Sequence, residues 1–275
     1  MGRGMSSQRE AQARSAFAIA RLGLDVSRHD KVVALAGNPN TGKSTVFNAL
    51  TGLRQHTGNW PGKTVSRAEG GFVHRDVGYK LVDLPGTYSL LSASQDEEVA
   101  RDFLLFGRPD CTIVVADATV LERNLNLVFQ VMEITDKVVV CVNLMDEAAR
   151  KGLSVDRGRL ASDLGVPVVL ATARTGAGLP ELLDAVSGVV AGEIVPAPRC
   201  PPPPEGLREA VEELLPLIKR VVPGVPNPRW VAYRLLEGDH SVRQALLDNQ
   251  LQRVISEQAK PVERKSRKVA LEGGQ

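Results

Sequence analysis

Residues 37–44 have the composition and spacing of a phosphate-binding loop. They read Gly-Asn-Pro-Asn-Thr-Gly-Lys-Ser, which fits the pattern GxxxxGK[ST]. An apolar run at 31–36 precedes them and an amphipathic segment at 44–50 follows, so the loop joins a predicted strand to a predicted helix. Backbone N–H groups of such a loop surround a β-phosphate, next to the positive end of the helix dipole. We expect Lys43 to reach the β- and γ-phosphate oxygens and Ser44 to complete a Mg²⁺ shell.

Two further motifs follow predicted strands. Asp83 and Gly86 form a DxxG, in which the carboxylate can hold a Mg²⁺ water and the Gly86 N–H can meet a γ-phosphate. Asn143 and Asp146 form an NxxD. The Asp146 carboxylate can accept two hydrogen bonds from guanine, whereas adenine has no matching donor pair, so GTP is preferred over ATP.

Two more candidates complete the pattern. Thr172-Ala173-Arg174 resembles a loop whose backbone meets the guanine oxygen, and Thr64 is placed to close over Mg²⁺ and the γ-phosphate. Each short motif is weak alone, since an Asp at a strand end is more often a helix cap than a ligand. All of them in one order, each at or near a strand's carboxyl end, predict a guanine-nucleotide-binding G domain.

These motifs give a defined set of candidates. The expected nucleotide-binding residues are Gly37, Asn38, Pro39, Asn40, Thr41, Gly42, Lys43, Ser44, Thr45, Gly62, Thr64, Asp83, Gly86, Asn143, Leu144, Asp146, Thr172, Ala173 and Arg174. The expected catalytic residues are Asn40, Lys43, Thr64 and Gly86. Ser44, Thr64 and Asp83 are the candidate Mg²⁺ ligands.

The elements that must position these residues alternate between strand and helix. Apolar runs rich in Val, Ile and Leu predict buried parallel strands at 31–36, 79–83, 111–116, 137–142 and 166–170. Helical patterns lie at 44–52, 94–106, 121–133, 154–165 and 179–190. An alternating segment at 65–75 predicts a sixth strand, joined to 79–83 as an antiparallel hairpin through a turn at 76–78. The predicted fold class is α/β: a mostly parallel six-stranded sheet with helices on both faces, as in Ras-like P-loop GTPases, with ligands at the strands' carboxyl ends.

Changes in composition and Pro-rich breaks divide the chain into segments. Residues 1–30 form an N-terminal extension, 31–191 the G domain, 192–206 a Pro-rich linker and 207–275 a small all-helical domain, which we expect to be disordered from 260 onward. In the helical part, patterns at 207–222, 230–236 and 242–255 predict three helices, with a break at 223–228. No apolar run is long enough to span a bilayer, so we expect this chain to be soluble.

Charge and cysteine usage exclude other classes. The net charge of +2 does not predict a nucleic-acid partner. Cys111 and Cys141 abut buried strands and read as small core residues, in keeping with a reducing cytosol. The four histidines lack ligand spacing, so no Fe²⁺ site is predicted.

Three segments resemble a known family. The stretch 58–65 (GNWPGKTV), the stretch 83–90 (DLPGTYSL) and the stretch 96–100 (DEEVA) are similar to the cytosolic N-terminal part of the bacterial ferrous iron transporter FeoB. Residues 229–239, with Arg-Trp followed by Leu-Leu-Glu-Gly-Asp, resemble the helical domain that follows the G domain there. The resemblance covers roughly residues 31–255, and the NWPG-x-T segment is its most specific part.

The resemblance implies a function. It implies a regulatory GTPase whose GTP or GDP state is signalled through switch loops and the helical domain to a membrane pore for ferrous iron. It also implies GTP, GDP and Mg²⁺ as ligands, a membrane domain of the same polypeptide as partner, and the cytoplasmic face of the bacterial inner membrane as location. A homo-oligomer of the full-length protein would be compatible with it.

Asn40 matches the asparagine that holds K⁺ beside the phosphates in potassium-activated members of the family. A bound K⁺ would neutralise developing charge as an arginine finger does. The alternative is a turn residue whose side chain binds local backbone. Faster GTP turnover in K⁺ than in Na⁺, lost in Asn40→Ala, would favour the first interpretation.

Two positions depart from common G proteins. Thr87 stands where Ras-type proteins carry the water-orienting glutamine, so we expect slow intrinsic hydrolysis. Leu144 replaces the lysine of NKxD, and we hypothesise weak GDP binding and quick release.

Other interpretations stay open. Trp60 and Pro61 are either switch residues or surface anchors of a loop, and the helical domain either couples to the switches or is a passive spacer. The rival functions are a ribosome- or RNA-associated GTPase and a nucleotide-binding module without meaningful turnover.

Overall fold

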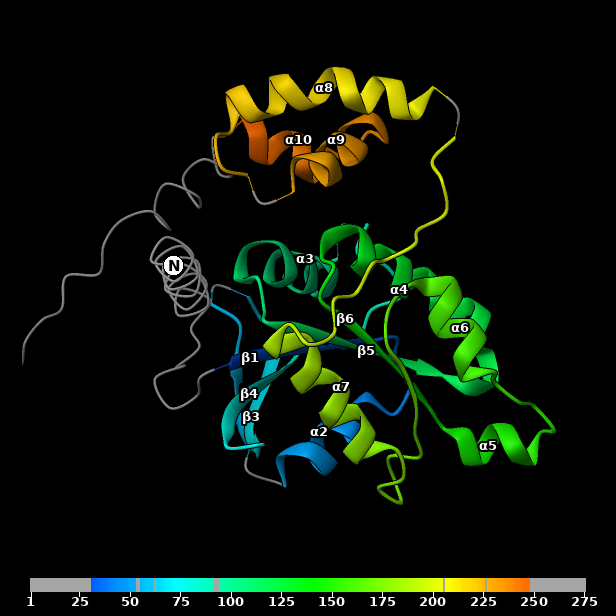
Figure 1. Ribbon diagram of the computed structural model, residues 1–275. Helices are drawn as coiled ribbons and strands as arrows, with labels where there is room; N and C mark the ends of the chain where they lie inside the picture. Colours follow the sequence, from blue (N-terminus) through cyan, green and yellow to red (C-terminus); the bar gives the residue numbers. More distant parts are fainter. Residues whose placement is uncertain are drawn as a thin grey trace, which may run out of the picture.

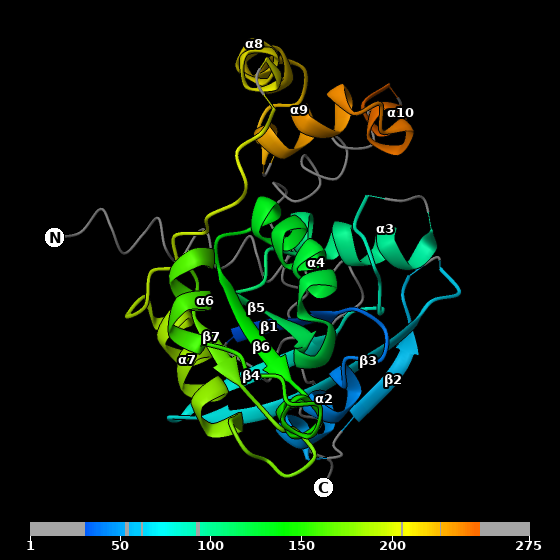
Figure 2. The same ribbon diagram turned by 90° about the vertical axis from the view of Figure 1, so that its right-hand side faces the viewer.

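A seven-stranded sheet forms the centre of the molecule (Figures 1 and 2). The computed structural model describes residues 31–52, 55–61, 63–91, 94–204, 206–225 and 227–247. The strands are β1 (Lys31–Gly37), β2 (Gln55–Asn59), β3 (Ser66–His74), β4 (Val77–Asp83), β5 (Cys111–Asp117), β6 (Val138–Asn143) and β7 (Val168–Leu170), in the order β2-β3-β4-β1-β5-β6-β7. Five strands, from β4 to β7 in that order, are parallel, and β2 and β3 extend the sheet antiparallel. The predicted α/β class is confirmed.

Helices cover both faces of the sheet. The G-domain helices are α2 (Lys43–Thr51), α3 (Gln95–Asp102), α4 (Leu121–Ile134), α5 (Met145–Arg150), α6 (Arg157–Leu164) and α7 (Leu179–Ala191). Alternate residues of β1 point to opposite faces because side chains alternate along a strand. Val33 and Leu35 belong to the core under α2 and α7, and Val32 and Ala34 to the core under α3 and α4.

Cys111 and Cys141 lie in the strands of this core. Both thiols are fully buried, and burial raises the pKa of each to about 12. The thiolate form that reacts or binds metal is therefore disfavoured in both. Their predicted role as small core residues is confirmed.

The sheet differs from the prediction at its antiparallel edge. Residues 55–59 form a seventh strand, β2, which pairs with β3 from Gln55↔Gly70 to Asn59↔Ser66. The hairpin turn was expected at 76–78, but the structure places it at Arg75 and Asp76. Both have positive φ, 49° and 61°, as a two-residue type I′ turn requires.

Three other elements, two helical segments and one strand, also differ from the prediction. A short helix not predicted from the sequence, α5, begins two residues after Asn143. The segment predicted as one helix at 94–106 is α3 followed by a π-helical turn, η1 (Phe103–Gly107), which ends at Arg108 in the left-handed conformation. The strand expected at 166–170 is limited to β7, which starts after Pro167.

Up to residue 247, where the described part of the chain ends, three helices follow the G domain. They are α8 (Leu207–Val221), α9 (Pro228–Leu236) and α10 (His240–Leu247). Both ribbon views show α9 and α10 between α8 and the face of the G domain that carries α3 and α4 (Figures 1 and 2). Buried residues of α8 and α9 belong to the same hydrophobic cluster as α4, so the core continues from one part into the other.

The Pro-rich connection is held against the G domain along part of its length. The backbone N–H of Ala197 donates to the Gly165 carbonyl at 2.8 Å, and that of Arg199 donates to the Leu164 carbonyl at 2.9 Å. Within the described ranges, no helix is long and apolar enough to cross a membrane. The expectations for residues 1–30, for Gly62, and for the chain beyond residue 247 lie outside the described residues.

Trp60 is a core residue, so it is not a surface anchor of its loop, and its role as a switch residue stays a prediction. Its side chain is 3% exposed and meets the Phe103 ring edge-on, with centroids 5.5 Å apart. The Arg67 guanidinium lies 5.6 Å from the Trp60 ring centroid. The neighbouring Pro61 is exposed. Trp60 therefore joins the loop after β2 to the turn after α3.

We expect Trp60→Ala to lower the free energy of unfolding by about 3–5 kcal/mol, because it leaves a cavity beside Phe103. Urea unfolding followed by circular dichroism measures this. Val73→Ala, at a side chain 74% exposed, serves as the matched control and should change stability by less than about 0.5 kcal/mol. A Trp60→Ala midpoint equal to that of Val73→Ala would contradict the core role.

Candidate functional site

The predicted phosphate loop joins β1 to α2 at the carboxyl edge of the sheet. At two of its glycines a side chain would clash with a neighbouring segment. A Cβ on Gly37 would lie 2.8 Å from the Val115 carbonyl oxygen, and Gly42, at φ 80°, would place one 2.4 Å from the Asn143 amide nitrogen. Helix α2 starts directly after Gly42 and has no side-chain cap. Its first N–H groups are thus presented to the loop, where an anion is favoured.

The other loop residues take distinct positions. Thr41 is buried, and its hydroxyl donates to the Asn38 carbonyl at 2.9 Å. Asn40 is exposed and left-handed, at φ 66°, a conformation that asparagine tolerates well. Ser44 and Thr45 are exposed in the first turn of α2. Pro39 lies about 3.6 Å from where a Cβ on Gly86 would be, so the loop and the DxxG segment adjoin.

Lys43 and the DxxG aspartate meet at one end of the site. The Lys43 ammonium forms an ion pair with the Asp83 carboxylate and donates to the Leu84 carbonyl at 2.7 Å. Burial raises the pKa of Asp83, and the Lys43 charge opposes part of that rise. Lys43, Asp83 and Gly86 line one cavity of about 330 Å³. The structure thus brings together the lysine, carboxylate and glycine that the sequence assigns to phosphate and Mg²⁺.

Asn143 fixes the loops relative to one another. Its buried amide donates to the Thr41 carbonyl at 3.1 Å and accepts from the Ala173 N–H at 3.0 Å. The phosphate loop and the 172–174 loop are therefore held by one side chain. Thr172 closes its own loop by accepting from the Thr175 N–H at 3.0 Å.

Asp146 lies in the first turn of α5, at the other end of the site. Its carboxylate accepts a hydrogen bond from the Arg174 guanidinium at 2.9 Å, and Arg150 lies 3.9 Å away. The Arg174 hydrogen bond lowers the pKa of Asp146, so the carboxylate stays ionised well below neutral pH. Leu144, which caps α5, has φ 63°, an uncommon conformation for a branched residue.

Thr64, predicted to close over Mg²⁺ and the γ-phosphate, is not among the residues that line the cavity beside Lys43. It is exposed, and its hydroxyl donates to Gln95 Oε1 at 3.1 Å. The adjacent Lys63 forms an ion pair of 2.8 Å with Glu98. Both contacts tie the loop after β2 to α3.

Thr87, at the position of the water-orienting glutamine, is buried. Its hydroxyl donates to the Ser89 carbonyl at 2.5 Å and lies 3.2 Å from Glu97 Oε1. The side chain is thus engaged in holding its own loop.

Among the lining residues that sequence reasoning missed, four have polar or charged side chains. They are Thr57, Ser66, Arg67 and Asp96. The first three come from β2 and β3, and β2 has no apolar alternation that would have revealed it. Among the described residues, no group of three or more His, Cys, Asp and Glu side chains could hold a metal ion. The Mg²⁺ candidates instead combine one carboxylate with hydroxyls, a set that suits a hard cation retaining waters.

Comparison with known proteins covers both parts of the chain. Residues 31–186 match the family model described as ferrous iron transport protein B, and residues 204–271 match the model described as the FeoB cytosolic helical domain. The chain belongs to the FeoB family. The predicted resemblance and the P-loop GTPase fold class are thereby confirmed.

Individual relatives agree with the FeoB assignment. The chain is 38% identical over 211 residues to the Fe(2+) transporter FeoB of Escherichia coli (strain K12), which covers 75% of this chain and 27% of the relative. It is 40% identical over 216 residues to an Fe(2+) transport protein A/Fe(2+) transporter FeoB fusion protein of Porphyromonas gingivalis, covering 75% of this chain and 25% of the relative. The chain therefore spans about a quarter of the length of the curated FeoB relatives it matches.

Solved FeoB structures match the fold. The cytosolic domain of the T. maritima FeoB iron transporter in GMPPNP form has a TM-score of 0.73 and 34% identity, covering 83% of this chain and 94% of that chain. The cytosolic domain of L. pneumophila FeoB has a TM-score of 0.70 and 34% identity, covering 82% of this chain and 96% of that chain.

Proposed function

We propose that this chain is the regulatory G domain and helical domain of a ferrous iron transporter, binding GTP and GDP and hydrolysing GTP slowly. The single observation that carries the proposal is that the predicted phosphate-binding residues and the predicted base-binding loops lie together in one site. Lys43, Asp83 and Gly86 share a cavity at one end, and Asn143 joins the phosphate loop to the Ala173 loop at the other. Solved relatives in GDP and GMPPNP forms support guanine nucleotides as the ligands.

The residues take separate roles in this proposal. Lys43 and the first N–H groups of α2 hold the β- and γ-phosphates, while the Gly86 N–H meets the γ-phosphate. Asp146 accepts from the guanine base, and the Thr172-Ala173-Arg174 backbone surrounds it. Ser44, Thr64 and Asp83 would hold Mg²⁺, which supplies charge neutralisation at the phosphates when bound. Thr64 would have to leave Gln95 to reach that position.

Slow turnover follows from Thr87. Its hydroxyl is held by Ser89 and Glu97, so we infer that no side chain at this position orients the attacking water. We also infer that Leu144, which cannot offer the polar contact of a lysine, weakens GDP binding. Phosphate release with GTP, Mg²⁺ and K⁺, alongside calorimetry with GDP, tests the proposal. No phosphate release, or binding of ATP in preference to GTP, would contradict it.

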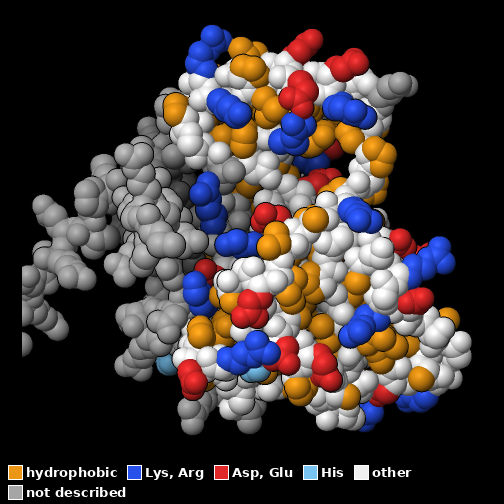
Figure 3. Space-filling model, viewed as in Figure 1, with side chains coloured by type: hydrophobic (Ala, Val, Ile, Leu, Met, Phe, Trp, Pro, Cys, Tyr) orange, Lys and Arg blue, Asp and Glu red, His pale blue; other side chains and the backbone are white. Residues whose placement is uncertain are grey.

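The whole transporter is part of the proposal. The full-length relatives are named Fe(2+) transporters, so the output would be a conformational signal to a membrane domain of the same polypeptide on the cytoplasmic face of the inner membrane. Acidic and basic side chains are interspersed on the face seen in Figure 3, without a continuous basic surface. Nothing on that face favours the ribosome- or RNA-associated alternative.

We expect GTP turnover to be faster in K⁺ than in Na⁺, with Asn40 as a ligand of the cation. Asn40 is an exposed, left-handed residue of the phosphate loop itself, at φ 66°. Asn40→Ala should remove the difference between the salts. Asn40→Gly should do the same, and it keeps the left-handed backbone unstrained. Initial rates of phosphate release at equal ionic strength measure this, and equal wild-type rates in both salts would refute it.

A further inference from the structure

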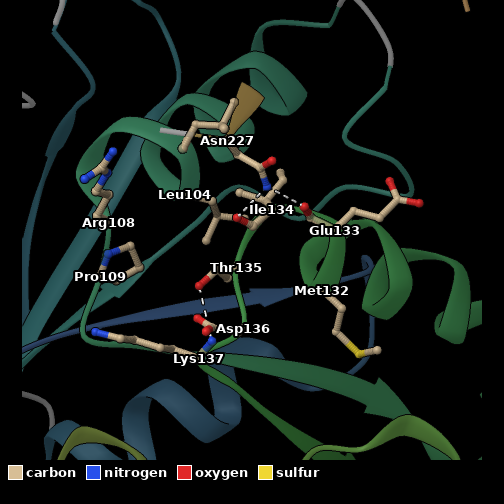
Figure 4. Close-up of a pocket in the computed structure, with 11 residues that line it drawn as sticks. Leu104, Arg108, Pro109, Met132, Glu133, Ile134, Thr135, Asp136, Lys137 and Asn227 are labelled. Atoms are coloured by element: carbon tan, nitrogen blue, oxygen red, sulfur yellow. Dashed lines mark hydrogen bonds between the residues drawn. The ribbon is translucent and has the colours of Figure 1, made fainter. Parts of the chain in front are cut away.

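One side chain caps two helices that belong to different parts of the molecule. The Asn227 amide nitrogen donates to the carbonyls of Glu133 and Ile134, at 2.7 and 3.3 Å, in the last turn of α4. The Asn227 amide oxygen accepts from the Trp230 N–H at 3.0 Å, at the start of α9. Figure 4 shows Asn227 bonded to these carbonyls, and Asn227, Glu133 and Ile134 all line a cavity of about 440 Å³. Asn227 thus satisfies carbonyls and an N–H that the two helices leave unpaired at their ends.

The preceding turn of α4 holds the loop that follows the DxxG motif. Gln130 Oε1 accepts from the Leu90 N–H at 2.7 Å and from the Ser89 hydroxyl at 3.3 Å. Gln130 lies three and four residues before Glu133 and Ile134, so the two contacts are one helical turn apart. Leu90 is 1% exposed, which makes its N–H dependent on this partner.

The loop is joined in turn to the phosphate loop. The Thr87 N–H lies 3.4 Å from the Gly37 carbonyl, and the Thr87 hydroxyl accepts from the Ser89 N–H at 3.2 Å. An unbroken series of contacts therefore runs from the phosphate loop through Thr87, Ser89 and Gln130 to Asn227. A second contact supports its far end, since the buried Arg234 of α9 lies 3.9 Å from the Glu133 carboxylate.

We propose that the C-terminal end of α4, from Gln130 to Ile134, is the relay between the nucleotide site and the helical domain, with Gln130 contacting the loop after the DxxG motif and Asn227 contacting the helix end. The inference rests on the proposed function, because the signal it carries is the change between GDP and GTP. Movement of the loop that carries Gly86 changes the hydrogen bonds that Ser89 and Leu90 donate to Gln130. The displaced Gln130 then shifts the α4 carbonyls that accept from Asn227. The start of α9 responds because its cap is the same side chain.

Hydrogen exchange of the full 275-residue chain, measured by mass spectrometry with GDP and with a non-hydrolysable GTP analogue, tests the relay. In the wild type, the exchange rate of peptides covering the start of α9 should differ between the two ligands by about twofold to thirtyfold, the size of residue-level coupling. Gln130→Ala should remove that difference. Asn126→Ala, at an exposed position of the same helix, should retain it.

Two conservative variants separate the relay from folding. Gln130→Glu keeps an acceptor for Leu90 and should keep the response. Asn227→Asp keeps the acceptor that caps α9 but loses the donor to α4, so α9 should stay protected while its response disappears. A response of α9 that persists in both Gln130→Ala and Asn227→Asp, or that is absent from the wild type, would overturn the relay.

Failure of the proposed function has a different signature. Exchange of residues 37–44 reports nucleotide binding directly in the same experiment. If those residues gain protection with GDP and α9 does not respond, the relay alone is wrong. If they gain none with either ligand, the nucleotide site itself is wrong.

Discussion

Asp146→Ala is expected to remove the preference for GTP over ATP and to weaken GDP binding by about 100-fold or more. Two hydrogen bonds to a charged acceptor contribute about 1.5–3 kcal/mol each, and each 1.4 kcal/mol is tenfold in affinity. Adenine offers no matching donor pair, so ATP affinity should change little. Competition of both nucleotides against a fluorescent GDP analogue measures the two affinities in one assay.

The local structure makes this prediction specific to one carboxylate. Asp146 accepts a hydrogen bond from Arg174 at 2.9 Å, and this contact lowers the pKa of its carboxyl, so alanine removes a charged acceptor and the partner of a guanidinium. Asp163→Ala is the matched control, because Asp163 is exposed on α6 and has only a distant ion pair, 3.8 Å from Arg159. Unchanged GDP affinity in Asp146→Ala would mean that the purine is recognised elsewhere.

The loops of the site were readable from the sequence because each follows a hydrophobic strand. Parallel strands place their carboxyl ends at one edge, so Lys43, Asp83 and Asp146 could be assigned to one site without knowledge of their distances. The phosphate loop is further restricted by Gly42, where any side chain would meet Asn143. Such local constraints restrict which residue types can occur, so they can be predicted from the sequence.

Contacts between segments far apart in the chain could not be predicted from the local residue pattern. Trp60 follows a strand, β2, that lacks apolar alternation, and its burial depends on Phe103 in a π-helical turn. Asn227 was expected only to lie in a break between helices, because its partners are 93 and 94 residues earlier in the chain. Arg174 was assigned by its backbone, whereas its side chain contacts Asp146. Tertiary packing determined these three features, and local pattern could not.

Lys43→Ala is expected to lower GTP turnover by at least about 100-fold, since removing one preorganised charge from a transition state costs that much. Lys43 lies where the phosphate loop, Asp83 and Leu84 meet, and among the residues that the structure describes no second lysine lines this cavity. Phosphate release at saturating GTP measures the effect. Lys151→Ala, at an exposed position after α5, is the matched control. Wild-type turnover in Lys43→Ala would exclude Lys43 from phosphate contact.

The same variant should change the pH dependence of stability, which gives an independent readout. Without the Lys43 ammonium, burial raises the pKa of Asp83 further above its value in the unfolded chain. Between these two pKa values the folded state keeps a proton on Asp83 that the unfolded state releases. The contribution of Asp83 to the free energy of unfolding is therefore complete below its unfolded-state pKa and is lost as the pH rises through its folded-state pKa. Urea unfolding of Lys43→Ala, measured at pH values from below the unfolded-state pKa of Asp83 to above its folded-state pKa, should show this fall in the free energy of unfolding. The fall should vanish in Lys43→Ala with Asp83→Asn, and its persistence there would assign it to another group.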